Sequence, residues 1–267
     1  MILVINVGNT DMIVAAFEGE EVAASWRMTT SAMKTSDEIG SSIMRFFEFD
    51  GINPEDIKDV VISSVVPNVM YSLTNAVKKY FLMQPIIIDS SIRCGIDLSR
   101  MRNPQEIGNN RLVNLAAAYH IYGGPVMVVD YSTCTTYDVV DEHGVFVTGI
   151  TSPGINICTE SLFVKAAQLP QIEIKKPDSI YCQDIVSCIQ GGIYYGHRGE
   201  AKYIINSIKE EMGIEKLTVV ATGGLARVID DKGEFFDIID PYLSFKGLRF
   251  IYEQNKNLRE GNRKCSL

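Results

Sequence analysis

The chain has 267 residues, enough for a sizeable core in one large or two medium domains. Its net charge of −8 argues against a broad nucleic-acid surface, which needs clustered basic side chains. Its six cysteines form no CxxC pair, so neither a disulfide framework nor a zinc site is expected. No apolar run reaches the about 20 residues that span a bilayer, and MILVIN lacks the basic start of a signal peptide. We therefore expect a cytoplasmic protein that binds neither nucleic acid nor membranes.

The first half of the chain alternates strand and helix patterns. The apolar run from Ile2 to Asn6 predicts a buried strand, and the Gly8-Asn9-Thr10 turn connects it to a returning strand. Ser36-Asp37-Glu38 and Pro67 are typical helix starts. The predicted strands cover 2–6, 12–17, 22–28, 60–64 and 86–88, and the predicted helices cover 36–49, 67–81 and 104–122.

The second half opens like the first. An apolar strand at 126–130 precedes a turn of small polar residues and two strands, at 136–140 and 145–150. A long helix at 184–212 and a strand at 217–221 follow. The repeated opening predicts an α/β protein with two similar lobes, 1–122 and 123–267, each with its own phosphate turn. A single doubly wound sheet is the alternative at this level.

Three turns follow strands and carry small or hydroxyl residues. Gly8-Asn9-Thr10 fits a plain hairpin, the commoner case, because Gly and Asn tolerate positive φ; its amides and hydroxyl also suit phosphate oxygens. The run from Asp130 to Thr136 places Ser and Thr behind an acid, with a Ser/Thr-rich β-turn as the alternative. Thr222-Gly223-Gly224 ends a strand, where backbone amides favour an anion. Together these turns favour a nucleotide in the cleft between the lobes.

A series of short motifs runs in order through nearly the whole chain. The motifs are Asn6-Val-Gly-Asn-Thr10, Ser63-Ser-Val-Val-Pro67, Asn103-Pro-Gln-Glu-Ile-Gly108, Arg111, Val129-Asp130 with Thr133, Thr135 and Thr136, Pro153-Gly154, Leu169-Pro170, Thr222-Gly-Gly224 and the closing segment from Leu243 to Tyr252. This series resembles the type III pantothenate kinase family.

The resemblance implies the fold shared by acetate kinase, sugar kinases, Hsp70 and actin, with two ribonuclease H-like lobes. It implies transfer of the γ-phosphate of ATP to the primary hydroxyl of pantothenate, the first step of coenzyme A biosynthesis. It also implies a homodimer with pantothenate near the dimer interface. A divalent metal such as Mg²⁺ and a monovalent cation, potassium or ammonium, accompany ATP in this family.

The resemblance also assigns roles to individual residues. Nucleotide and phosphate binding fall to Gly8, Asn9, Thr10, Ser132, Thr133, Thr135, Gly223 and Gly224, substrate binding to Met101, Gly108, Arg111 and Asp184, and the monovalent cation to Asp130. Three of these depart from the family: Ser132 replaces a usual Gly, Met101 a usual Tyr, and Asp184 a Thr. A carboxylate at 184 would repel pantothenate or a similar small acid, whereas Arg111 would attract it.

Two further departures affect the chemistry. Asn6 and Asn110 stand where the family has aspartates, one near the phosphates and one as the presumed base. An amide keeps the shape of a carboxylate but cannot accept a proton near neutral pH. Loss of general-base help costs about 10²–10⁴ in rate, so we expect weak or absent activity. Compensation by Asp11 or Glu106 is one alternative; a silent ligand-binding homologue with a regulatory role and a transcriptional accessory protein are the others.

Overall fold

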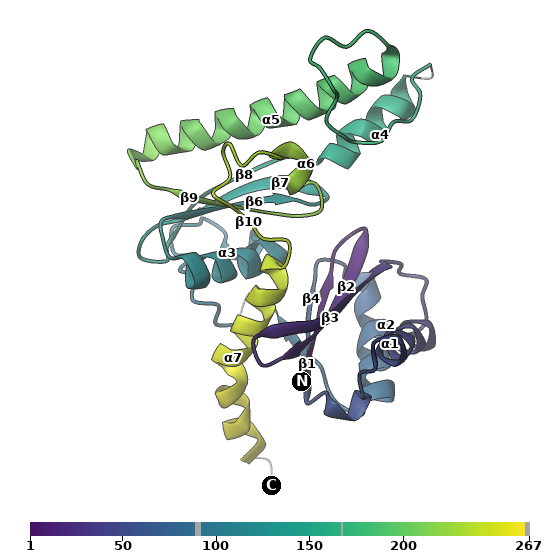
Figure 1. Cartoon of the computed structure of the whole chain (residues 1–267). Helices are drawn as coiled ribbons and strands as arrows, with labels where there is room; N and C mark the ends of the chain where they lie inside the picture. Colours follow the sequence, from purple (N-terminus) through teal and green to yellow (C-terminus); the bar gives the residue numbers. More distant parts are fainter. Residues whose placement is uncertain (89–91, 167, 265–267) are drawn as a thin grey trace. The chain divides into compact units, whose positions relative to one another are not determined.

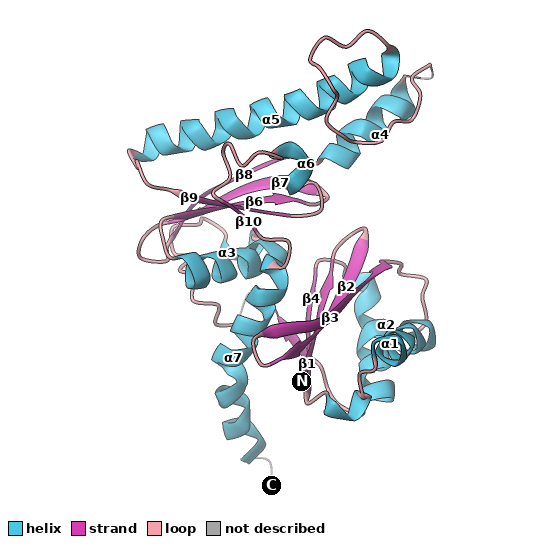
Figure 2. Cartoon of the chain, in the orientation of Figure 1, coloured by secondary structure: helices cyan, strands magenta, loops and turns pink. Residues whose placement is uncertain are grey.

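The computed structural model describes residues 1–88, 92–166 and 168–264, with side chains up to residue 256. Cys265, one of the six cysteines, lies outside this range. The chain forms two compact units. The first comprises Met1–Gly95, Arg102–Ala117 and the chain from Ser244 on; the second comprises Ile96–Met101 and Ala118–Leu243. Each unit holds one five-stranded sheet, drawn in magenta in Figure 2.

The sheet of the first unit has the strand order β3-β2-β1-β4-β5. Its strands are β1 (Ile2–Val7), β2 (Asp11–Glu18), β3 (Glu21–Thr29), β4 (Asp59–Ser64) and β5 (Ile86–Ile88). β1 pairs with β2 in antiparallel and with β4 in parallel orientation. The strands predicted for the first half are therefore confirmed, and their ends differ only by the small shifts normal for such boundaries.

Two helices cover one face of this sheet, α1 (Ser36–Asp50) and α2 (Pro67–Phe81) (Figure 1). Their apolar sides bury Ile39 and Leu73 against Leu3 and Ile5 of β1. α1 begins at Ser36, as predicted, and Thr35 caps it by forming a capping box with Glu38. Strand alternation then directs the side chains of the even-numbered β1 residues to the opposite face.

The helix predicted for 104–122 is interrupted. A short 3₁₀ turn, η2 (Pro104–Glu106), precedes α3 (Asn109–Tyr122), because Ile107 is buried with an extended backbone between them. The first half of α3 packs against α7 (Leu243–Lys264), where the Ser244 hydroxyl donates to Asn114 Oδ1 at 2.7 Å. The compact units therefore place most of α7 with the first unit, whereas the sequence-based division has a single boundary between 122 and 123.

The second sheet repeats the topology of the first. Read from its other edge, its order is β8-β7-β6-β9-β10, which matches β3-β2-β1-β4-β5 strand for strand. Its strands are β6 (Val126–Tyr131), β7 (Cys134–Val140), β8 (Phe146–Pro153), β9 (Thr218–Thr222) and β10 (Ile238–Ile239). The duplicated opening predicted from the sequence is thus confirmed, although β10 was not predicted because only two residues form it.

Helix α5 (Ile185–Met212) lies along one face of the second sheet (Figure 1) and buries Ile193, Ala201 and Ile205 against it. α4 (Ile155–Lys165) was not predicted; η1 (Pro54–Asp56) and the short α6 (Ala226–Ile229) complete the elements of the described chain. Among the described helices, none combines the length and apolar character needed to cross a membrane.

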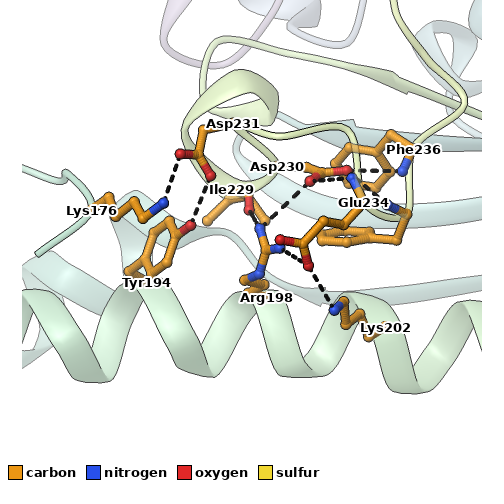
Figure 3. A network of polar contacts seen from close by, with 10 residues as sticks. Lys176, Tyr194, Arg198, Lys202, Ile229, Asp230, Asp231, Glu234 and Phe236 are labelled. Atoms are coloured by element: carbon orange, nitrogen blue, oxygen red, sulfur yellow. Dashed lines mark hydrogen bonds and ion pairs between the residues drawn. The ribbon is translucent and has the colours of Figure 1, made fainter. Parts of the chain in front are cut away.

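A polar network holds the segment after α6 (Figure 3). The carboxylate of Asp230 accepts hydrogen bonds from the backbone N–H groups of Glu234, Phe235 and Phe236. Arg198 of α5 donates to the carbonyl of Ile229 at 2.7 Å and lies 3.5 Å from Asp230. Burial opposes ionisation of Asp230, but these N–H donors and Arg198 keep its pKa below the ordinary value. These contacts therefore attach the loop at 230–236, which follows α6, to α5.

Candidate functional site

Asn6 occupies the carboxyl end of β1 on the face away from the α1 and α2 core. Its cross-strand neighbours are Ile13 of β2 and Ser63 of β4. The side-chain carbonyl oxygen of Asn6 is buried and has no hydrogen-bond partner within the chain. Because a buried polar atom without a partner is costly, this oxygen is free to accept a hydrogen bond or to contact a cation.

Asn110 lies in the first turn of α3, next to the same end of the sheet. The Ser63 hydroxyl donates to Asn110 Oδ1 at 3.3 Å, and the neighbouring Asn109 donates to the Ile88 carbonyl at 3.1 Å. The structure therefore brings Asn6 and Asn110 together through Ser63. Ser63 was not predicted as a site residue, although its place in a motif at the end of a strand was a usable signal.

The turn between β1 and β2 is a tight hairpin. Gly8 N–H donates to the Asp11 carbonyl at 2.9 Å, and the Thr30 hydroxyl donates to the Gly8 carbonyl at 2.8 Å. Asn9 and Thr10 are exposed. Neither Gly8 nor Asn9 has a positive φ, so the positive-φ reason given for these residues is wrong. The glycine is instead favoured by space, since a Cβ at position 8 would lie 3.2 Å from the Asp11 carbonyl oxygen.

The second unit carries the hydroxyl-rich turn between β6 and β7. Ser132 is exposed, and its N–H and hydroxyl both donate to the Cys134 carbonyl, at 3.1 and 3.4 Å. Thr133 is half-buried. The hydroxyls of Thr135 and Thr136 are buried and have no partner within the chain. Such unpartnered hydroxyl oxygens fit a site that is completed by a ligand.

Two glycines bring backbone against this turn. A Cβ at Gly154 would lie 2.1 Å from the Thr133 carbonyl oxygen, and one at Gly223, where φ is +90°, would lie 2.3 Å from that of Tyr131. Gly224 has open space beside it. The turns at 132–133, 153–154 and 222–224 therefore lie close together at the same end of the strands of the second sheet. Backbone that approaches this closely, with no side chain between, fits the phosphates of a nucleotide.

Asp130 precedes this turn on the opposite face of the sheet from the α5 core. It is the cross-strand neighbour of Thr136 and, on the other side, of Thr222. A carboxylate beside hydroxyl oxygens suits a hard cation, which prefers oxygen ligands.

The residues assigned to the substrate are divided between the units. Gly108 and Arg111 lie beside Asn110 in the first unit, where Arg111 N–H donates to the Gly108 carbonyl at 3.0 Å. Met101 and Asp184 belong to the second unit. Asp184 caps α5 by accepting hydrogen bonds from the hydroxyl and the N–H of Ser187, which lower its pKa. This cap gives Asp184 a structural role besides the substrate role that the resemblance assigned to it.

A divalent metal finds few candidate ligands. Among the described residues, no three His, Cys, Asp or Glu side chains are grouped to hold a metal ion. A metal that accompanies nucleotide phosphates needs only one or two protein oxygens, the rest coming from phosphate and water. The unpartnered Asn6 Oδ1 fits this smaller requirement as a neutral ligand.

Comparison with known proteins agrees with the motif series. A profile of the family described as type III pantothenate kinase matches residues 2–207. A curated type III pantothenate kinase from Agathobacter rectalis is 47% identical over 257 residues, which cover 96% of this chain and 98% of that protein.

Solved structures with low sequence identity show the fold. A protein described as a Baf family transcriptional activator from Campylobacter jejuni matches with a TM-score of 0.56 at 18% identity, covering 96% of this chain and all of that one. The activator of 2-hydroxyisocaproyl-CoA dehydratase from Clostridium difficile, with bound ADPNP, matches with a TM-score of 0.55 at 14% identity, covering 97% of each chain. With the two equivalent sheets, these matches confirm the two ribonuclease H-like lobes of the acetate and sugar kinase, Hsp70 and actin fold.

The family profile covers most of the chain and the curated relative nearly all of it, as the order of the motifs had indicated. The chain belongs to the type III pantothenate kinase family.

Proposed function

We propose that this chain transfers the γ-phosphate of ATP to the primary hydroxyl of pantothenate, and that Asn6 and Asn110 slow the transfer. The observation that carries the reaction is the 47% identity to a curated type III pantothenate kinase over nearly the full length of both chains. Identity of this extent, without large gaps in coverage, supports the same substrate class and the same reaction for both proteins.

The second unit supplies the groups that hold the nucleotide. ATP provides the phosphoryl group, and the Thr133 amide and the hydroxyls of the 132–133 turn would bind its phosphates. The bare backbone at Gly223 and Gly224 would admit the rest of the nucleotide, since Gly224 has no neighbour where a side chain would extend. Asp130, with the unpartnered Thr136 hydroxyl across the strand pair, would hold potassium or ammonium.

The first unit supplies the groups next to the reacting hydroxyl. Arg111 would attract the carboxylate of pantothenate, and Asn110 would accept a hydrogen bond from the hydroxyl. Asn110 cannot take the hydroxyl proton, because an amide oxygen is not a base near neutral pH. Phosphoryl transfer depends mainly on positioning and charge neutralisation, so the reaction persists without a base. We expect it to be at least about 100-fold slower, from the usual contribution of a general base.

A silent homologue is the second candidate function. The observation that favours it is that both changed positions adjoin Ser63, which is the strand neighbour of Asn6 and donates a hydrogen bond to Asn110. Losing both charges at one place removes the metal-orienting carboxylate as well as the base. Such a protein would still bind ATP or a pantothenate-like acid and would act by regulation.

We also propose a homodimer through the exposed surface of α4, the start of α5 and residues 168–184 between them. This surface exposes large apolar side chains at Ile157, Leu162, Val164, Ile180, Tyr181, Ile185 and Val186. Soluble monomers rarely expose so many neighbouring apolar side chains, and a self-complementary interface would cover them. Light scattering at micromolar concentration is expected to give twice the chain mass; a monomer mass would contradict the proposal.

The test of function is the formation of phosphopantothenate. Purified protein is incubated with ATP, Mg²⁺, K⁺ and pantothenate, and the product is measured by mass spectrometry over hours. Slow product formation that requires both ATP and pantothenate is expected. If no product forms while the protein still binds ATP in calorimetry, the silent homologue is the correct description.

A further inference from the structure

Asp11 lies on the same sheet face as Asn6. In β2, the side chains of Met12, Val14 and Ala16 belong to the core under α1 and α2. Strand alternation therefore directs Asp11 to the other face, where Asn6 of β1 also points.

The strand register makes Asp11 and Asn6 diagonal neighbours across the β1–β2 hairpin. Asn6 pairs with Ile13, so Asp11 is its diagonal neighbour toward the turn. Diagonal neighbours in an antiparallel pair lie about 7–8 Å apart, which is within the reach of a cation held by one carboxylate and a bridging water. The hydrogen bond from Gly8 N–H to the Asp11 carbonyl fixes the backbone at this position.

The carboxylate of Asp11 has one weak ion-pair partner, Arg27. Its ion pair with Arg27 is long, with 3.5 Å between Nη1 and Oδ2, and the two side chains are 37% and 61% exposed. Exposed pairs of this kind contribute little to stability, so a cation can compete with Arg27 for the carboxylate.

Two other acids of the first unit are less well placed. Glu106 is exposed on η2 and accepts a hydrogen bond from Asn103 at 2.8 Å. Asp59 starts β4, at the opposite end of the sheet from Asn6, and accepts a hydrogen bond from Tyr252 at 2.8 Å.

We propose that Asp11 supplies the metal-orienting carboxylate that Asn6 no longer provides, so that the divalent metal of the metal–nucleotide complex is held between the Asp11 carboxylate and the Asn6 carbonyl oxygen. This inference rests on the proposed ATP site, and it predicts that Mg²⁺ strengthens nucleotide binding through Asp11. Compared with the family, the negative charge near the phosphates would thus lie at the start of β2 and not at the end of β1.

Calorimetry with the β,γ-imido analogue of ATP, with and without Mg²⁺, tests the inference independently of turnover. The parent is expected to bind the analogue more tightly with Mg²⁺ than without it. Asp11→Asn should reduce this Mg²⁺-dependent gain by about 10-fold without weakening the metal-free binding, because the lost charge would only repel metal-free phosphates. Arg27→Gln breaks the same ion pair but keeps the carboxylate, so it is the matched control and should retain the full gain.

A relocation variant guards against misfolding. The double change Asn6→Asp with Asp11→Asn returns the charge to β1 and should restore the Mg²⁺-dependent gain. An unchanged gain in Asp11→Asn, or an equal loss in Arg27→Gln, would overturn the role of Asp11 while the ATP site stands. If the parent does not bind the analogue in either condition, the proposed ATP site is wrong and this inference falls with it.

Discussion

The Ser63 hydroxyl donates a hydrogen bond to the side-chain carbonyl of Asn110 across 3.3 Å, and Ser63 is the strand neighbour of Asn6. One buried serine thus joins the two positions at which the family's carboxylates are missing. Aspartate has nearly the same shape as asparagine, and a carboxylate at 110 would accept the same hydrogen bond more strongly. The surroundings of position 110 are therefore still suited to an acid.

Variants of the two glycines in the 222–224 turn test stability and nucleotide binding separately. Gly223→Ala is expected to destabilise the protein by about 2 kcal/mol or more, because φ is +90° and the new Cβ would meet the Tyr131 carbonyl. Gly224→Ala meets no neighbour and should change stability by less than about 0.5 kcal/mol.

The same Gly224→Ala variant should weaken ATP binding by about 10-fold, since the methyl group would lie where the nucleotide approaches the backbone. Thermal melts and calorimetry measure the two effects separately. Unchanged ATP affinity in a stable Gly224→Ala protein would show that the nucleotide does not use this turn.

The network in Figure 3 predicts unequal effects for two cations of α5. Arg198→Ala leaves the fully buried Asp230 carboxylate without its cation and should destabilise the protein by about 2–3 kcal/mol. Lys202 is 44% exposed, pairs with the similarly exposed Glu234 and lies 5.6 Å from the centre of the Phe235 ring, so Lys202→Ala should cost less than about 1 kcal/mol. Urea unfolding measures both; equal losses would contradict the assigned roles.

His197 predicts a pH dependence of stability. The His197 side chain is buried on α5, and its Nδ1 has no hydrogen-bond partner. Burial lowers the pKa of His197 below the ordinary value of 6.5, although the negative charge of Glu200 acts to raise it. The unfolded chain therefore binds a proton more readily than the folded chain, so stability should fall as the pH drops below 6.5.

His197→Asn should reduce the fall in melting temperature between pH 7.5 and pH 5.5. His143→Asn, at a side chain that is 78% exposed, is the matched control. An identical pH dependence in the parent and in His197→Asn would exclude this histidine as the cause.

The sequence predicted the parts of the fold whose signals are local. Apolar runs such as Ile2 to Asn6 and the duplicated strand-turn-strand opening identified both sheets, and the small residues of three turns identified the candidate site. α4 was missed because its apolar residues, such as Ile157 and Leu162, are spread around the helix and not concentrated on one side.

Features that depend on tertiary contacts were not predictable in the same way. The break before α3 follows from the burial of Ile107, and the link between Asn6 and Asn110 follows from the register of β4 beside β1. The cap formed by Asp184 could have been anticipated, since an acid three residues before Ser187 at a helix start is a capping pattern.

The most direct test of the account compares turnover of the parent with that of the Asn6→Asp/Asn110→Asp variant, using ATP, Mg²⁺, K⁺ and pantothenate at saturating concentrations. The account predicts that the double variant phosphorylates pantothenate at least about 100-fold faster, because it regains a base at position 110. A parent that already matches the double variant would contradict it and show that the two asparagines do not limit the reaction.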